Sequence, residues 1–204
     1  VNSRSFDILK EDTPEVNENQ IVLLDEMLNT SEWSRFRNPI HRDKINEHYF
    51  KLTKLLRALS NMFDKEIVIC LHPKDDFDLK KKYFEDFRVV QHKTRENICK
   101  SFIVLFFESS AIIDALLLRK KMITIISKVM DQNQIDGGLH YHKHAGIMII
   151  NIDQNLNFEK EDFLKQLDET TKKYNYYINT YITPDGQQLG YKKIIKIIKE
   201  RYFN

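Results

Sequence analysis

Cysteine is scarce in this sequence, which contains only Cys70 and Cys99 among 204 residues. The two lie far apart and form no CxxC pair, which argues against a disulfide scaffold and against a zinc site built from thiolates. A reducing compartment is therefore expected, and the cytoplasm is the simplest localisation.

Long apolar runs are missing as well. No stretch approaches the roughly 20 apolar residues that a membrane-spanning helix needs. The first residues, VNSRSFDILKEDTP, contain no apolar core of a signal peptide. We expect a protein that is neither secreted by a visible signal nor embedded in a membrane.

The sequence also lacks an excess of one charge. Its 32 basic and 30 acidic residues leave a net charge of +2, too little to favour nucleic acid or a membrane surface as a partner. Glycine-rich phosphate-binding fingerprints such as GxGxxG and GxxxxGK[ST] are absent, which argues against dinucleotide oxidoreductases and P-loop ATPases. Any ligand must be recognised by a local arrangement of side chains.

What is present is an apolar content of 42%, enough to build one hydrophobic core. Short apolar runs typical of buried strands alternate with segments in which apolar residues recur every three or four positions, as in amphipathic helices. The expected strands are 21–24, 67–71, 88–90, 102–107, 122–126 and 147–150. The expected helices are 42–62, 77–86, 111–121, 159–173 and 189–202, with one helical turn at 94–97.

This alternation predicts an α/β fold, a Rossmann-like and mostly parallel sheet of about six strands with helices on both faces, followed by C-terminal helices. We expect one domain over residues 1–204. Within it, 1–20 would be a lead-in loop, 21–150 the α/β core and 151–204 the helical part. In such folds ligands bind beyond the carboxyl ends of the strands, so functional residues are expected there.

The clearest candidate for a functional strand end is Glu108-Ser109-Ser110, which follows the most apolar run of the chain. At this place a helix start with its free N–H groups and two hydroxyls would suit a phosphate. The alternative is that one serine caps the helix, with Asp114 nearby.

The second unusual strand end is His72-Pro73-Lys74. The proline fixes the exit of the chain, the imidazole could donate to a phosphate or a ribose, and the lysine adds positive charge. The alternative is a turn that ends the strand and holds a partly buried histidine.

A third candidate is the segment 130–146, expected to be a loop rich in glycine and histidine. If it were extended, the alternation of His140, His142 and His144 would place all three on one face, as some metal sites require. A lid over an anionic ligand and an ordinary solvated loop are the alternatives, and we predict neither a metal nor a cofactor.

Other charged residues carry weaker signals. Asp136 and Asp185 could act as a base or bind a ribose hydroxyl, although Asp185-Gly186 is more typical of a turn. The run Lys80-Lys81-Lys82 is interpreted as a solvated helix face rather than a nucleic-acid patch.

Together, the order of the HP motif, the strong strand, the ESS motif, the helix with Asp114 and Lys120-Lys121 resembles one half of certain GT-B glycosyltransferases. The similarity covers residues 65–127. It is to the C-terminal, donor-binding half of capsule and teichoic-acid enzymes, such as CDP-glycerol glycerophosphotransferases and bacterial polysialyltransferases.

The resemblance implies a nucleotide-sugar donor of the CMP, CDP or UDP type. His72 and Pro73 would lie near the phosphate or ribose, and Ser109 and Ser110 would hold phosphate. It also implies a facing N-terminal domain, on this or a partner chain, and work at the inner face of the membrane with at most peripheral attachment.

The leading hypothesis is therefore nucleotide-sugar binding in a glycosyltransferase of surface-polysaccharide synthesis. A non-catalytic module that binds nucleotide or protein is the first alternative. The second is a nucleotide-sugar hydrolase or epimerase that uses the histidine segment for acid–base chemistry. The catalytic candidates are His72, Glu108 and His142, and no nucleic-acid partner is expected.

Overall fold

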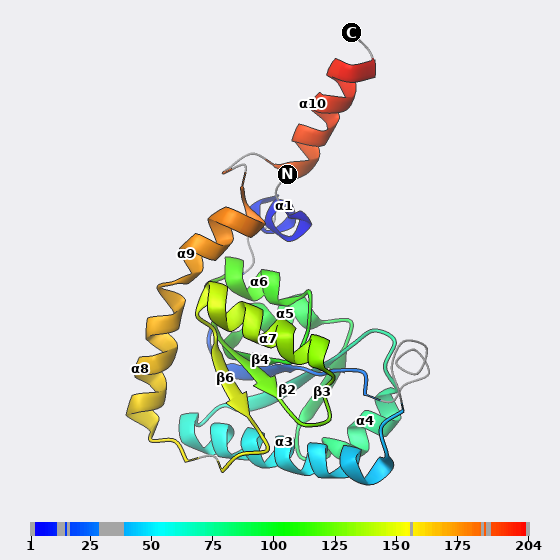
Figure 1. The fold of residues 1–204 in the computed structure, drawn as a ribbon, viewed down its shortest axis with the longest axis vertical. Coiled ribbons are helices and arrows are strands. Elements are labelled where there is room, and N and C mark those ends of the chain that lie inside the picture. Colours follow the sequence, from blue (N-terminus) through cyan, green and yellow to red (C-terminus); the bar gives the residue numbers. More distant parts are fainter. Residues whose placement is uncertain are drawn as a thin grey trace.

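The computed structural model describes residues 3–11, 15, 17–28, 39–155, 157–184, 186 and 189–202. Its centre is a sheet of six parallel strands in the order β3-β2-β1-β4-β5-β6 (Figure 1). The strands are β1 (Gln20–Leu24), β2 (Glu66–Leu71), β3 (Arg88–Gln91), β4 (Ser101–Phe106), β5 (Lys121–Ile126) and β6 (Met148–Asn151). The predicted Rossmann-like fold class is confirmed.

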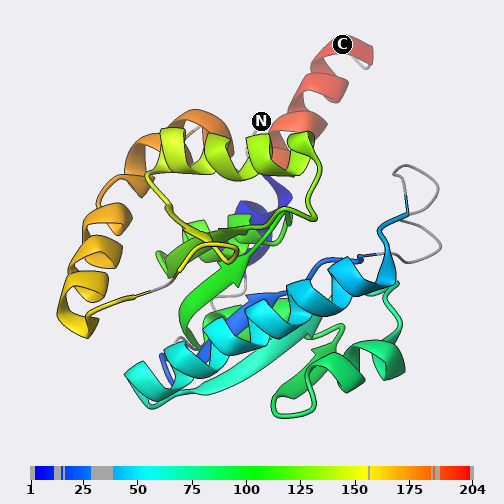
Figure 2. The ribbon, with the colours of Figure 1, turned by 60° about the horizontal axis from the view of Figure 1, so that its bottom comes forward.

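Helices cover both faces of the sheet (Figure 2). They are α1 (Arg4–Glu11), α3 (Arg42–Phe63), α4 (Phe77–Tyr83), α5 (Thr94–Cys99), α6 (Ile112–Leu117), α7 (Gln132–Ala145), α8 (Lys160–Thr171), α9 (Tyr174–Tyr177), the π-helix η1 (Ile178–Ile182) and α10 (Gly190–Tyr202). None of these described helices combines the length and apolar character needed to cross a membrane.

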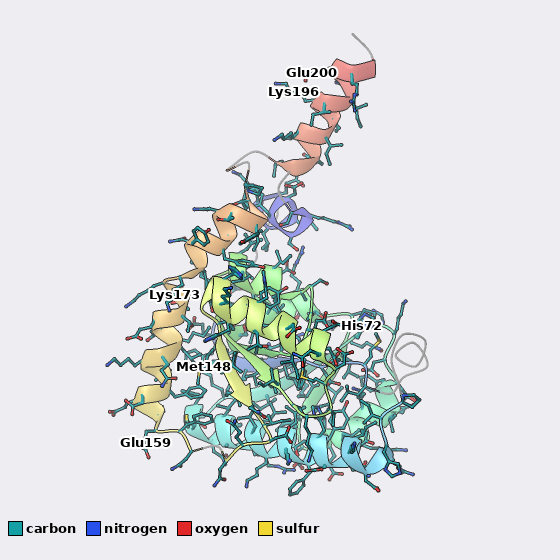
Figure 3. The ribbon with its side chains drawn as sticks, viewed as in Figure 1. His72, Met148, Glu159, Lys173, Lys196 and Glu200 are labelled. Carbon is teal, nitrogen blue, oxygen red and sulfur yellow. The ribbon has the colours of Figure 1, made fainter. Side chains whose placement is uncertain are left out.

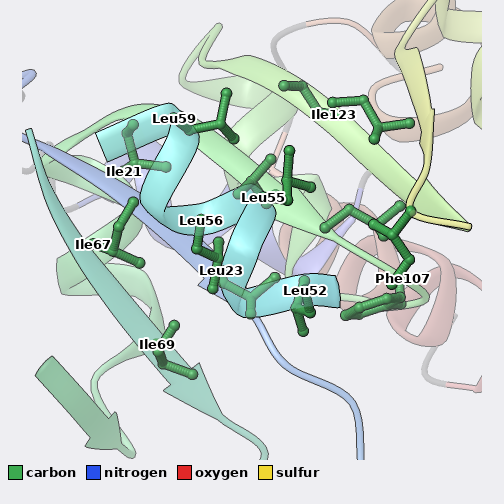
Figure 4. Packing of buried hydrophobic residues seen from close by; sticks show 14 of the residues in the cluster. Ile21, Leu23, Leu52, Leu55, Leu56, Leu59, Ile67, Ile69, Phe107 and Ile123 are labelled. Carbon is green, nitrogen blue, oxygen red and sulfur yellow. The ribbon is translucent and has the colours of Figure 1, made fainter. Parts of the chain in front are cut away.

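The alternation of side chains along β1 explains the layering. Ile21 and Leu23 point to one face and pack against α3, where Leu52 and Leu56 are fully buried (Figure 4). Val22 and Leu24 point to the other face, which α5, α6, α9 and the end of α7 cover. All five residues of β1 are buried, as expected for a strand covered on both faces.

Two expectations about loops were wrong. The segment 1–20 contains the helix α1, which packs beside α6 and α10. The segment 130–146 is largely the helix α7, begun by a capping box of Asp131 and Gln134 and ended by Gly146 in the left-handed conformation (φ 72°). The Gly137-Gly138 pair suggested a loop, but Gly138 lies tightly against β5, since a Cβ there would be 3.0 Å from Thr124 Oγ1.

Candidate functional site

A cavity of about 800 Å³ lies at the carboxyl ends of β1, β2 and β4. The neighbours β1 and β4 mark the place where the strand order reverses, the position at which open α/β sheets bind ligands. The cavity is lined by Leu24, Asp25, Glu26, Met27, Cys70, Leu71, His72, Pro73, Thr94, Glu108, Ser109, Ser110 and Ala111. The fold therefore brings the HP and ESS motifs, 36 residues apart from His72 to Glu108 in the sequence, to one hollow.

The HP turn is fixed by backbone and side-chain contacts. The Lys74 N–H donates to His72 Nδ1 at 3.2 Å, so in the neutral imidazole the ring hydrogen is on Nε2. Gln91 of β3 donates to the carbonyls of His72, Pro73 and Asp75 at 3.0, 3.3 and 3.2 Å. His72, labelled in Figure 3, is exposed and lines the cavity, and it is thus held as a hydrogen-bond donor without needing a positive charge. Lys74 is exposed and is not part of the lining.

The ESS turn differs in detail from a helix cap. The N-cap position of α6 is Ala111, and Ser109 Oγ accepts from the Ala111 N–H at 3.3 Å. The first N–H groups of the helix bond to the Ser109 and Ser110 carbonyls at 3.4 and 3.3 Å. Neither serine is the N-cap, and the two hydroxyls, rather than free helix N–H groups, are what this turn offers to a ligand.

Asp114, expected near the serines as part of a helix start, has another role. Arg95 of α5 donates to both of its carboxylate oxygens, at 3.0 and 3.1 Å. This bidentate ion pair joins α5 to α6, and the Asp114 side chain in it is buried. Asp114 therefore fixes the helix behind the ESS turn.

Behind the cavity lies a buried cluster of charge that the sequence did not indicate. Lys80 is only 1% exposed, so its interpretation as part of a solvated helix face was wrong. Its Nζ lies 2.5 Å from Asp25 Oδ2 and 3.2 Å from Asp75 Oδ2, and it also contacts the Tyr49 hydroxyl and, at 2.5 Å, the Glu26 carbonyl. Lys80 thus ties the loop after β1 to the turn after β2, the two walls of the cavity.

Burial dominates the titration of this cluster. It raises the pKa of Asp25 above its ordinary value and that of Asp75 to about 6, although the Lys80 ammonium opposes both shifts. Burial alone would lower the pKa of Lys80, but Asp25, Tyr49 and Asp75 together hold it above its usual range. Lys80 therefore stays charged, whereas Asp75, with a pKa of about 6, titrates close to neutral pH.

The histidines of α7 do not reach the cavity. A helix turns by about 100° per residue, so alternate residues lie on nearly opposite faces and the expected common face does not exist. The rings of His140 and His144 are in contact, with centroids 4.5 Å apart and planes tilted by 40°, whereas His142 Nδ1 is 2.8 Å from the Ile147 carbonyl oxygen. Among the described residues, no three His, Cys, Asp or Glu side chains converge as metal ligands.

The remaining acidic candidates lie elsewhere. Asp136, on the exposed side of α7, accepts from Gln132 at 2.8 Å, and Asp185 lies outside the described residues. The residues missed at the site are Asp25, Glu26, Met27 and Thr94. Asp25 and Glu26 directly follow a predicted strand, so the same rule that drew attention to His72 would have found them.

The fold and its cavity define a Rossmann-like α/β protein with a cavity at the switch point of its parallel sheet. No family model matches the sequence, and a search of curated proteins finds no match. Among solved structures, the chain is similar to the UDP-GlcNAc 2-epimerase of Methanocaldococcus jannaschii, solved in complex with UDP-GlcNAc and UDP.

The identity to that epimerase is 14% and the TM-score is 0.53, over 98% of this chain and 54% of the epimerase chain. At this identity the likeness shows the fold alone. The chain spans about half the length of the epimerase.

Proposed function

We propose that the cavity binds the nucleotide of an activated sugar or polyol donor. The observation that carries this proposal is that the HP and ESS turns, singled out separately in the sequence, line one cavity at the switch point of the sheet. The similar epimerase structure contains UDP-GlcNAc and UDP, which supports the same ligand class.

In this proposal, different side chains contact different parts of the ligand. The His72 Nε2–H and the Ser109 and Ser110 hydroxyls donate to the diphosphate, where donors held in advance stabilise negative charge most effectively. Glu108, exposed at the rim, accepts from ribose or sugar hydroxyls.

In its finer form, the proposal makes the chain the donor-binding half of a cytoplasmic glycosyltransferase that builds bacterial surface polysaccharide from a CMP, CDP or UDP donor. A second domain or partner chain then supplies the acceptor site. His72 and Glu108 remain the catalytic candidates at the cavity. The similar epimerase structure supports the epimerase alternative, but a role for His142 in it has less support. The His142 ring is hydrogen-bonded to the Ile147 carbonyl and lies outside the cavity lining.

A thermal-shift panel of CMP, CDP, UDP, GDP and their sugar conjugates tests the binding. A ligand at 100 times its Kd stabilises the folded state by about 2.7 kcal/mol. We expect a selective shift with a cytidine or uridine nucleotide, and a folded Ser109→Ala/Ser110→Ala variant that binds about 1–3 kcal/mol more weakly.

The matched control is Thr170→Ala/Thr171→Ala, which removes two adjacent hydroxyls at the end of α8 and should leave affinity unchanged. Equal nucleotide affinity in the serine variant and the wild type would contradict the proposal. A flat panel would favour the non-catalytic module that binds a protein, and binding without donor turnover would separate recognition from catalysis.

A further inference from the structure

The helix α10 projects from the body of the protein (Figure 1) and exposes a row of large apolar side chains. Ile194, Ile195, Ile197 and Ile198 are 46%, 48%, 45% and 44% exposed. An isolated helix of 13 residues is only marginally stable in water. Four half-exposed isoleucines on such a helix indicate that another surface covers it.

The start of α10 is fixed to the body. The buried Asp7 carboxylate of α1 accepts from the N–H groups of Gly190 and Tyr191 at 2.7 and 3.1 Å. The Tyr191 hydroxyl also donates to Glu11 at 2.7 Å. The helix is therefore held at its first turn while the rest of it extends away from the sheet.

The charge of α10 is strongly one-sided. Its sequence, GYKKIIKIIKERY, contains five basic residues and one acidic residue, a net charge of +4. Since the whole chain carries +2, the remainder carries −2, and the positive charge is concentrated on this one element.

Helical spacing separates the isoleucines from three of the four lysines, whereas Arg201, four positions after Ile197, borders the apolar face. Ile194 and Ile198 share one face with Ile195, as residues three and four positions apart do. Lys192, Lys196 and Lys199 lie on the opposite face, and Lys196 forms an ion pair with Glu200 at 3.7 Å (Figure 3). An apolar face opposite a basic face is the pattern of helices that lie in a membrane interface.

We infer that α10 docks on a membrane surface that contains anionic lipids. The isoleucines would enter the boundary between headgroups and acyl chains, while the lysine stems reach back to the anionic headgroups. A second copy of this chain is a poorer partner for the same face, because it would bring two helices of charge +4 together. The inference does not depend on the nucleotide site.

Flotation of the full chain with vesicles tests the inference. We expect binding to vesicles of equal parts phosphatidylcholine and phosphatidylglycerol, no binding to phosphatidylcholine alone, and release at high salt, which screens surface charge. Failure to bind the anionic vesicles would overturn the inference. The nucleotide panel of the preceding proposal is run without lipid, so either idea can fail alone.

Two pairs of variants locate the contact. Ile194→Gln/Ile198→Gln keeps helix propensity and should weaken vesicle binding by at least about tenfold. The control Leu79→Gln/Leu139→Gln changes two side chains of similar exposure, 45% and 42%, on other helices.

The second pair tests the charge. Lys196→Gln/Lys199→Gln should weaken vesicle binding about thirtyfold. Its control is Lys81→Gln/Lys82→Gln on α4.

Vesicle binding that survives either α10 variant would overturn the inference. A second result would also overturn it: a wild-type protein that binds no vesicles and is a dimer by light scattering, while the isoleucine variant is a monomer. That result would make the apolar face an interface between copies of the chain.

Discussion

Lys80 of α4 lies with its Nζ 2.5 Å from Oδ2 of Asp25 at the end of β1, and both side chains are almost completely shielded from solvent. Asp75, on the turn after β2, shares the same ammonium group. Three ionisable groups in one buried cluster thus join the two walls of the cavity that His72 lines. Stability and ligand binding should both depend on this contact.

Replacing Lys80 by methionine should destabilise the fold by about 3–5 kcal/mol, because it leaves two buried carboxylates without their cation. Urea unfolding followed by circular dichroism measures the change. Lys81→Met, on the same helix but exposed, is the control and should alter stability by less than about 0.5 kcal/mol. A loss below about 1 kcal/mol in Lys80→Met would show that the cluster contributes little to stability.

His48 makes stability depend on pH. It is buried in α3 with Nδ1 3.1 Å from Ser127 Oγ, and burial lowers its pKa to about 4. The unfolded chain binds the proton near pH 6.5, so the stabilising contribution of neutral His48 is complete above that pH and is lost as pH falls toward 4. Between pH 7 and pH 5 the loss should be about 2 kcal/mol.

The His48 contribution is isolated by comparison with His48→Gln, which cannot titrate. Asp75 acts in the opposite sense. Its raised pKa of about 6 gives a contribution that is full below about pH 4 and is lost as pH rises through 6. Unfolding free energies of wild type, His48→Gln and Asp75→Asn across this range separate the two. Parallel pH profiles for wild type and His48→Gln would contradict the assignment.

The two adjacent glycines of α7 should respond oppositely to alanine. No described atom outside the helix lies within 4 Å of a Cβ placed at Gly137, so Gly137→Ala should stabilise the protein by about 0.5–1 kcal/mol. At Gly138 the Cβ would meet Thr124 Oγ1 at 3.0 Å, so the same change should give no gain or a loss. Melting temperatures compare them, and equal gains would show that α7 is not tightly packed on β5.

Gln91 should affect the proposed nucleotide site without large effects on the fold. Its amide holds the carbonyls of His72, Pro73 and Asp75, so Gln91→Leu frees the HP turn. We expect nucleotide affinity to fall by up to about tenfold, about 1.4 kcal/mol. Isothermal titration calorimetry measures the affinity, and Gln132→Leu, on the exposed side of α7, is the control. Unchanged affinity in Gln91→Leu would show that the turn needs no such support.

The sequence by itself determined the six strands, the long helix α3 and the parallel α/β class, because alternation and spacing of apolar residues report directly which faces are buried. It also located the HP and ESS turns, since both interrupt apolar runs at strand ends. These inferences rest on the spacing of apolar and polar residues that are close together in the sequence.

Only the tertiary structure decided that these turns share one cavity and that Lys80 lies behind it. In the sequence, Lys80 is indistinguishable from Lys81 and Lys82, because burial of its ammonium depends on Asp25 and Asp75 arriving from two other elements. The same holds for α7, whose glycines mimic a loop until close packing on β5 is visible. Partners distant in the chain, rather than neighbouring residues, determine these features.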